Sequence, residues 1–123
     1  MSPLTVLVDG NNLFQTLDRS GRDHPERIET FLQRLELAAV SKDWEVTVIF
    51  DGPERFLPRE KGPLVVRYAK GRTADTLIER QVYQAADRAS MVVVTRDRAE
   101  ADLVLGLGAR VWSPGRLLEE LAQ

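Results

Sequence analysis

Acidic residues stand where short apolar runs of this chain stop, and this pattern constrains the fold more than any other feature. The runs Leu4–Val8, Val46–Phe50 and Met91–Thr95 are rich in β-branched residues, which is typical of buried strands. An acid follows each run, directly or after one Arg: Asp9, Asp51 and Asp97. In an open parallel α/β sheet, ligands bind outside the carboxyl ends of the strands. The pattern therefore predicts an acidic site at one sheet edge.

Helical patterns alternate with most of the strands. We expect helices near residues 12–18, from 25 to about 39, from 73 to about 89, from 98 to 107, and after Ser113-Pro114, where Ser is a good N-cap and Pro a good first helical residue. Further strands are expected at 64–68 and 109–112. This alternation predicts one α/β domain over residues 1–123, with a mostly parallel sheet of about five strands and helices on both faces. A Pro- and Gly-rich loop, 52–63, replaces the helix between two strands.

Composition excludes several other classes of protein. The chain has 123 residues, of which 43% are hydrophobic and 29% charged, as expected for a globular domain. No apolar run reaches the roughly 18 residues that span a membrane, and no signal peptide is expected at the N-terminus. Without cysteine, and with His24 as the single histidine, a zinc site or a Ser-His triad is improbable. We expect a cytoplasmic protein that does not bind membranes.

Asp75 joins the acidic set from another part of the chain. It follows Thr73, a predicted N-cap, and so lies in the first turn of a helix. Each acid also has an ordinary structural explanation: Asp75 complements the helix dipole, Asp97 and Glu100 match a capping box, and Asp51-Gly52 is a common turn pair. Their joint placement at strand ends favours a site instead. Clustered carboxylates repel one another, and Mg²⁺ prefers such oxygen ligands.

At these residues the chain resembles the NYN domain of the PIN-like ribonuclease superfamily, most closely its bacterial YacP-like group. The matching blocks occur in the family's order: 8–12 (Val-Asp-Gly-Asn-Asn), 49–52 (Ile-Phe-Asp-Gly), 73–78 (Thr-Ala-Asp-Thr-Leu-Ile) and 94–97 (Val-Thr-Arg-Asp). The resemblance implies a three-layer PIN-like fold with strand order 3-2-1-4-5. It also implies a metal-dependent endoribonuclease, with Asp9, Asp75 and Asp97 as metal-binding acids and Asn12 as a further catalytic-site residue. Neither Glu100 nor Asp102 falls cleanly on the fourth acid of some relatives.

Elementary phosphodiester chemistry agrees with that expectation. Hydrolysis needs a deprotonated water and neutralised phosphoryl charge, and Mg²⁺ or Mn²⁺ held by carboxylates can supply both. We expect Asn11 or Asn12 to orient the water or a phosphate oxygen, and Thr95 to hold an acid by a hydrogen bond. The accessory candidates near the site are Asn11, Asp51, Glu79, Thr95, Glu100 and Asp102.

Basic residues bracket the acids in sequence and predict an RNA-binding surface. Those on the chain around Asp75 and Asp97 are Arg67, Lys70, Arg72, Arg96 and Arg98. We expect the free N–H groups at the start of the helix after Arg72 to attract phosphate as well. The Pro/Gly loop adds Arg55, Arg59 and Lys61, together with Phe56 as a base-stacking candidate. The expected partner is RNA, including mRNA on the ribosome; the sequence does not indicate an oligomeric state.

Two other readings stay open on the sequence. A PIN-like module could bind RNA with little or no activity. A response-regulator receiver, with Asp51 as phosphoacceptor, matches in length and in Asp9 and Thr95, but the Lys expected after its last strand is missing because no Lys follows Lys70.

Overall fold

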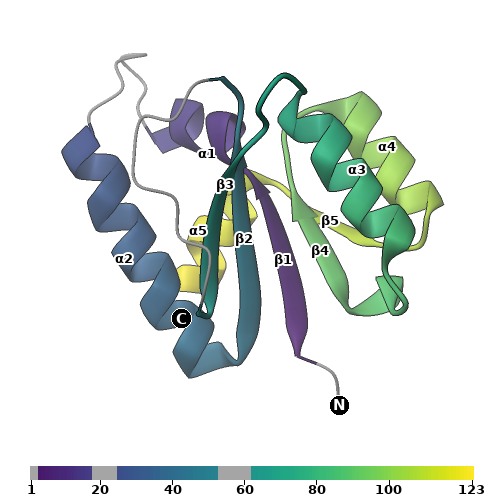
Figure 1. The fold of residues 1–123 in the computed structure, drawn as a ribbon. Helices are drawn as coiled ribbons and strands as arrows, with labels where there is room; N and C mark the ends of the chain where they lie inside the picture. The colour runs from purple at the N-terminus through teal and green to yellow at the C-terminus, as the bar shows by residue number, and fades with distance from the viewer. Residues whose placement is uncertain (1–2, 18–24, 53–61) are drawn as a thin grey trace.

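A single parallel sheet of five strands forms the centre of the molecule (Figure 1). The computed structural model describes residues 3–17, 25–52 and 62–123. The strands are β1 (Leu4–Asp9), β2 (Trp44–Phe50), β3 (Leu64–Tyr68), β4 (Met91–Val94) and β5 (Arg110–Trp112). Their order is β3-β2-β1-β4-β5, which confirms the predicted topology. A receiver would have the order 2-1-3-4-5, so that reading is wrong.

Strand β1 lies in the middle because its residues are apolar on both faces. Val6 pairs with Val46 of β2 on one side and with Val92 of β4 on the other. Val6, Leu7 and Val8 have no exposed surface, as expected of a central strand in a parallel sheet. All strand pairs are parallel, so their carboxyl ends meet at one edge, which lies at the top of Figure 1.

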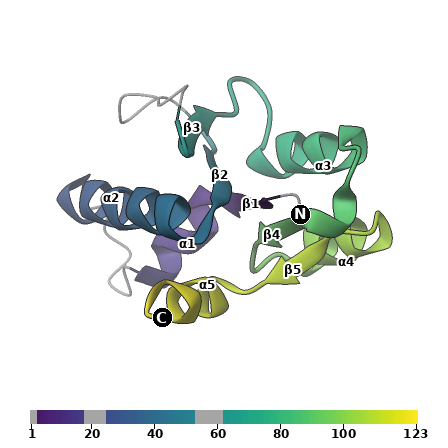
Figure 2. The same ribbon diagram turned by 90° about the horizontal axis from the view of Figure 1, so that it is seen from below.

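Helices cover both faces of the sheet and make three layers (Figure 2). On one side lie α1 (Gly10–Leu17), α2 (Pro25–Lys42) and α5 (Pro114–Leu121); on the other lie α3 (Ala74–Gln84) and α4 (Arg98–Gly106). Each side encloses its own apolar cluster, with Leu13, Leu35 and Leu117 in the first and Ile78 and Val104 in the second. Among the helices described, none is long and apolar enough to cross a membrane.

Helix α1 begins directly at Gly10, earlier than the predicted start near Asn12. A Cβ on Gly10 would lie 2.6 Å from Cδ1 of Phe50 and 3.1 Å from the carbonyl oxygen of Ile49. The Phe50 ring cannot easily give way, because it stacks on Phe14 at 5.2 Å and on Tyr68 at 5.6 Å between ring centroids. Glycine therefore allows the chain to turn from β1 into α1 beside the end of β2.

Helix α3 is shorter than predicted. It ends at Gln84, and Ala85 has an extended backbone, so the expected helix to Ala89 is wrong in its last turn. The guanidinium of Arg88 donates hydrogen bonds to the carbonyl oxygens of Val82 and Tyr83. A side chain thus satisfies carbonyls that a further helical turn would have used. A short 3₁₀ turn, Arg88–Ser90, then leads into β4.

Candidate active site

Asp9 is the last residue of the central strand and a buried acid at the carboxyl edge. Only 2% of its surface is exposed. One carboxylate oxygen, Oδ1, accepts a hydrogen bond from the backbone N–H of Asn12 at 3.2 Å, which ties it to the first turn of α1. Burial raises the pKa of Asp9 to about 6, and the charges of Asp75 and Asp51 add to this rise, whereas the bond from Asn12 opposes it.

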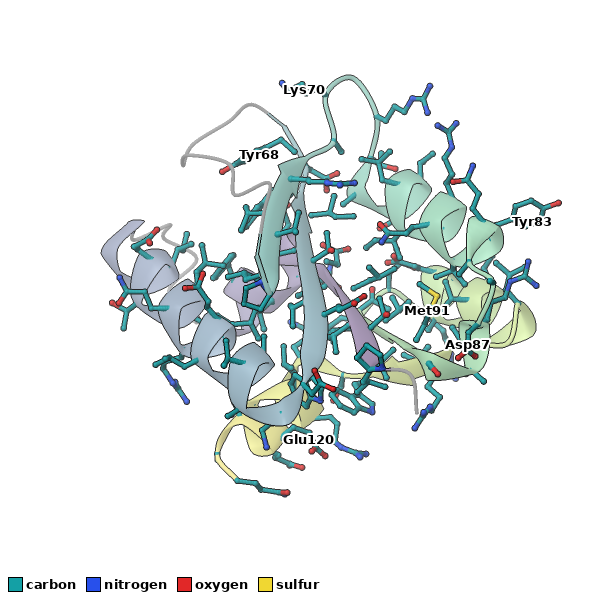
Figure 3. All side chains as sticks on the ribbon, turned by 60° about the horizontal axis from the view of Figure 1, so that its bottom comes forward. Tyr68, Lys70, Tyr83, Asp87, Met91 and Glu120 are labelled. Atoms are coloured by element: carbon teal, nitrogen blue, oxygen red, sulfur yellow. The ribbon has the colours of Figure 1, made fainter. Side chains whose placement is uncertain are left out.

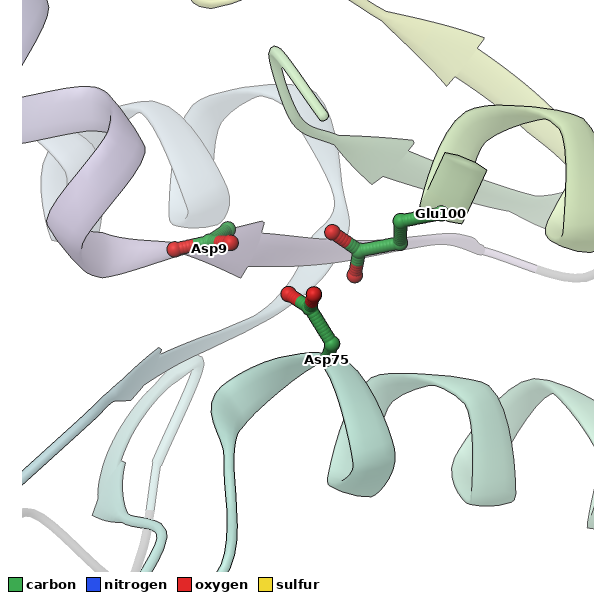
Figure 4. A group of neighbouring side chains, drawn as sticks. All are labelled: Asp9, Asp75 and Glu100. Atoms are coloured by element: carbon green, nitrogen blue, oxygen red, sulfur yellow. The ribbon is translucent and has the colours of Figure 1, made fainter. Parts of the chain in front are cut away.

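Asp75 reaches the same place from the first turn of α3. Thr73 is the N-cap of this helix, as predicted, and its hydroxyl oxygen accepts from the N–H of Thr76 at 3.2 Å. Ala74 and Ile78 of the same helix are fully buried against the sheet, which fixes the rotation of α3. The half-buried Asp75 side chain points toward Asp9 (Figure 4).

Glu100 completes the group from α4, and its burial is unusual for a carboxylate. It is 2% exposed, and its Oε2 accepts a hydrogen bond from the hydroxyl of Thr95 at 2.8 Å. Its other oxygen, Oε1, is buried and has no hydrogen-bond donor among the described residues. Burial raises the pKa of Glu100 to about 8, with the charges of Asp75 and Asp9 acting in the same direction and Thr95 opposing them.

These three carboxylates form a compact group, here called the acidic cluster: Asp9, Asp75 and Glu100. Each contributes one oxygen, and these oxygens all lie within 4.8 Å of one another. Figure 4 shows the three side chains converging from β1, α3 and α4. At such distances the negative charges repel strongly unless protons or a cation compensate them. Asp9, from a strand end, and Asp75, from the first turn of a helix, therefore meet at this edge, as the sequence predicted.

Asp97 lies outside the acidic cluster, although it was predicted as a metal ligand. It is exposed and serves as the N-cap of α4: its Oδ1 accepts from the N–H of Glu100 at 3.1 Å. This is half of the predicted capping box. The reciprocal half is replaced, because the N–H of Asp97 donates to the Thr95 hydroxyl at 3.0 Å and the Glu100 carboxylate turns to the cluster instead. Metal binding by Asp97 stays a prediction.

The two asparagines after Asp9 are engaged with backbone groups. The side-chain oxygen of Asn11 accepts from the N–H of Asp51 at 2.8 Å, and that of Asn12 accepts from the N–H of Arg96 at 2.6 Å. The carboxylate of Asp51 accepts from the N–H of Ala74 at 2.6 Å. These bonds join the ends of β1, β2 and β4 to the start of α3. The predicted role of the asparagines in orienting water or phosphate stays a prediction.

The remaining accessory candidates have different surroundings. Thr95 is 4% exposed and holds Glu100 by its hydroxyl, which confirms the expectation that it hydrogen-bonds an acid. Glu79 is half-buried on α3 and Asp102 is exposed on α4, and neither belongs to the acidic cluster.

Exposed cations lie on both sides of the cluster. Arg67 is the next-to-last residue of β3, Lys70 lies on the turn that follows (Figure 3), and Arg72 precedes the N-cap of α3. Arg96 and Arg98 flank Asp97. The expected free N–H groups at the start of α3 are largely taken, because Ala74 donates to Asp51 and Thr76 to Thr73. These two N–H groups are therefore not open to phosphate. Arg55, Phe56, Arg59 and Lys61 lie outside the described residues, as does His24.

Comparison with known proteins identifies the family. The model of the YacP-like NYN domain matches residues 6–123. This chain belongs to the YacP-like NYN family. The family has a PIN-like nuclease fold, and the acidic cluster lies at the sheet edge of that fold.

Two solved structures of the same protein resemble this NYN domain throughout. A tryptophan-to-leucine mutant of Rae1 (YacP) from Bacillus subtilis superposes with a TM-score of 0.75 at 24% identity, over 97% of this chain and 75% of that one. Rae1 (YacP) from Bacillus subtilis itself gives a TM-score of 0.74 at 24% identity, over 96% and 73% of the two chains. At this identity the likeness establishes the fold. Comparison with the curated proteins finds no match.

The acidic cluster fits a hard divalent cation. Carboxylate oxygens are the ligands that Mg²⁺ and Mn²⁺ accept most readily, and three of them converge here. The buried Glu100 Oε1, which lacks a donor among the described residues, offers a lone pair that a cation would satisfy. Burial, which raises the pKa of both Asp9 and Glu100, disfavours their negative charge unless a proton or a cation compensates it.

Proposed function

We propose that this NYN domain is an endoribonuclease that depends on Mg²⁺ or Mn²⁺ held by Asp9, Asp75 and Glu100. The observation that carries the proposal is the acidic cluster, with its donor-free Glu100 oxygen, at the carboxyl edge of a PIN-like sheet. Membership in the family supports RNA as the substrate class. The proposed metal ligands differ from those expected from the sequence in one residue: Glu100 stands in place of Asp97.

In the proposed hydrolysis, the residues of the acidic cluster hold the cation and Thr95 orients one of them. A bound divalent cation neutralises phosphoryl charge and provides a nucleophile at neutral pH. Asp9 and Glu100 come from buried positions, so their oxygens are held in fixed places by the surrounding core. Thr95 fixes the orientation of the Glu100 carboxylate, as groups around metal ligands commonly do.

The RNA strand is expected to run along the exposed cations beside the cluster. Arg67, Lys70 and Arg72 lie on the Asp75 side, and Arg96 and Arg98 lie on the Glu100 side. Phosphate contacts of this kind supply affinity that is independent of sequence and falls with salt. They bring the scissile bond to the carboxylates without taking part in the chemistry.

Cleavage of a circular RNA tests the proposal, because a circle has no ends and only an endonuclease can open it. We expect opening with Mn²⁺ and none with EDTA. Asp9→Asn and Asp75→Asn should abolish opening, since each removes a charge from the cluster. Asp102→Asn is the matched control: it removes an exposed carboxylate of α4 outside the cluster and should leave cleavage unchanged.

Two outcomes would contradict the nuclease proposal. Cleavage that survives in EDTA and in both cluster variants would show that the carboxylates are not the active centre. RNA binding without cleavage at any Mg²⁺ or Mn²⁺ concentration would support the RNA-binding module instead.

A further inference from the structure

The end of β2 holds both ends of the loop that leads to Asp75. At the loop's beginning, the N–H of Ala69 donates to the carbonyl oxygen of Phe50 at 2.9 Å. At its end, the N–H of Ala74 donates to the carboxylate Oδ1 of Asp51 at 2.6 Å. Ala74 is the first residue of α3, so this carboxylate caps the helix from a different element and complements the helix dipole. Asp51, together with the N-cap Thr73, thus fixes the start of α3.

Asn11 in turn fixes Asp51. Its side-chain oxygen accepts the N–H of Asp51 at 2.8 Å, and Asn11 lies two residues after Asp9 on α1. A continuous path of hydrogen bonds therefore runs from the helix that follows Asp9, through Asp51, to the helix that carries Asp75. Both bonds span long stretches of chain, so no local rule of helix capping would produce them.

Asp51 itself is placed to support the acidic cluster without belonging to it. It is exposed, and the oxygens that come within 4.8 Å of one another belong to Asp9, Asp75 and Glu100. One of its oxygens is already used by the backbone N–H of Ala74. Besides adding its charge to the field at Asp9, a carboxylate in this position can act on the metal site by fixing the backbone at Ala74, next to Asp75.

We propose that Asp51 and Asn11 are positioning residues that hold the Asp75 carboxylate at the spacing the metal requires. The inference rests on the proposed function, because it assumes that Asp75 is a metal ligand. It assigns Asp51 the role of a hydrogen-bond acceptor for Ala74. A metal ligand or a source of charge would need the negative charge of the carboxylate, whereas an acceptor for Ala74 needs only an oxygen in the same place.

Two substitutions at Asp51 separate these roles. Asp51→Asn keeps an oxygen acceptor of the same shape and removes the charge, whereas Asp51→Ala removes both. We expect Asp51→Ala to weaken Mn²⁺ binding about 10- to 100-fold, the usual effect of losing a group that supports a metal ligand. Asp51→Asn should bind Mn²⁺ nearly as well as the wild type. Calorimetric titration with MnCl₂ measures the affinity, and the electron paramagnetic resonance spectrum of bound Mn²⁺ reports the ligand geometry.

The N-cap of α5 supplies the matched control. Ser113 is the N-cap of α5, and its hydroxyl accepts from the N–H of Arg116 at 3.0 Å. Ser113→Ala removes an N-cap on a helix that contributes no residue to the acidic cluster. It should lower the melting temperature to a similar extent as Asp51→Ala but leave the Mn²⁺ affinity and spectrum unchanged. If Asp51→Ala does not fold, Asn11→Ala tests the same path and should also weaken Mn²⁺ binding, with Asn11→Asp restoring the acceptor.

The outcomes distinguish this inference from the proposed function. Equal losses of affinity in Asp51→Asn and Asp51→Ala would overturn the positioning role in favour of charge or ligation. Unchanged affinity in Asp51→Ala and Asn11→Ala, with binding abolished by Asp75→Asn, would overturn the inference and leave the metal site standing. No saturable Mn²⁺ binding by the wild type would overturn both.

Discussion

The acidic cluster has two flanks, one on each side of Asp9: the Glu100 flank, with Thr95, Asp97 and Glu100, and the Asp75 flank, with Asp51, Ala74 and Asp75. The two are held by different kinds of contact. On one flank, Glu100 is held by residues close to it in sequence: Thr95 bonds its carboxylate and Asp97 bonds its N–H. On the other flank, Asp75 depends on contacts between distant parts of the chain, from Asn11 to Asp51 and from Asp51 to Ala74. The hydrogen bonds to Glu100 itself thus lie within a contiguous turn, which Asn12 of α1 also anchors through the N–H of Arg96. The helix that carries Asp75 is positioned largely by tertiary contacts.

This difference bears on how each flank responds to change. A contiguous turn keeps its hydrogen bonds whenever β4 and α4 are formed, because the partners are only a few residues apart. The Asp75 flank requires β1, β2 and α3 to be in register with one another. We therefore expect the Glu100 flank to tolerate distant substitutions better, and the Asp75 flank to lose its geometry first.

Removing the charge of Glu100 or, in a separate variant, that of the α4 N-cap Asp97 tests which of the two is the metal ligand. The Glu100 variant has the largest expected effect. Glu100→Gln should lower cleavage by more than about 100-fold, because losing a ligand costs more than the 10- to 100-fold typical of a supporting group. Asp97→Asn keeps an acceptor for the Glu100 N–H and should retain most activity. Cleavage rates at saturating Mn²⁺ measure both. The reverse ranking would show that Asp97, as the sequence predicted, is the ligand.

That test also marks the limit of prediction from sequence. The strand order, the strand ends and the position of Asp75 follow from apolar periodicity, from N-cap chemistry and from the family's motifs. The choice between Asp97 and Glu100 does not, because both fit a capping box and their roles depend on where the α4 carboxylates point. The Thr95 hydroxyl accepts the N–H of Asp97, the bond that the Glu100 carboxylate would accept in a capping box. The Glu100 carboxylate instead accepts from Thr95 and points into the acidic cluster. The link from Asp51 to Ala74 is equally hidden, since it depends on tertiary packing over many residues.

The pH dependence of folding reports how strongly burial disfavours the charged forms of Asp9 and Glu100. The pKa of Glu100 is raised from its ordinary 4.5 to about 8 and that of Asp9 from 3.8 to about 6, mainly by burial. The folded protein therefore holds these protons more tightly than the unfolded chain does. This stabilisation is present in full below about pH 4 and is lost as the pH rises toward 8.

We therefore expect the metal-free protein to lose on the order of a few kcal/mol of unfolding free energy between pH 4.5 and 8.5. Urea titrations in EDTA measure this loss. Glu100→Gln should remove the greater part of it, and the exposed Asp102→Asn should remove none. Mn²⁺ binding should strengthen over the same range, because the metal displaces the protons. A metal-free stability that rises toward pH 8 would contradict the burial of these carboxylates.

Gly10 stands between the two flanks, so adding a methyl group there tests whether they share α1 as a common support. Gly10→Ala should destabilise the fold by about 1–3 kcal/mol, because its Cβ would collide with the stacked Phe50 ring. Gly106→Ala is the control: nothing lies within 4 Å of its Cβ, and the change should be neutral or slightly stabilising. Chemical denaturation compares the two. A neutral Gly10→Ala would show that α1 can shift without cost to either flank.

The smallest expected effect compares the cations of the two flanks. Replacing Arg67, Lys70 and Arg72 by Ala should weaken RNA binding modestly and flatten its salt dependence by about 2 in logarithmic slope, at about 0.7 for each phosphate contact on a single strand. Replacing Arg96 and Arg98 should flatten it by about 1.4 on the same basis. Fluorescence anisotropy of a labelled oligonucleotide in EDTA, over a series of salt concentrations, measures both slopes.

Arg34→Ala on α2 serves as the control for the cation variants, since this exposed Arg lies on the layer opposite α3 and α4 and should not alter the slope. If the Asp75 flank guides the RNA, the triple variant loses affinity while turnover at saturating RNA changes little, because the acidic cluster is intact. An unchanged slope in the triple variant together with a flattened slope in the double variant would place the strand on the Glu100 flank. The flank that depends on distant contacts would then serve the metal alone, and the contiguous turn would carry both the ligand and the substrate.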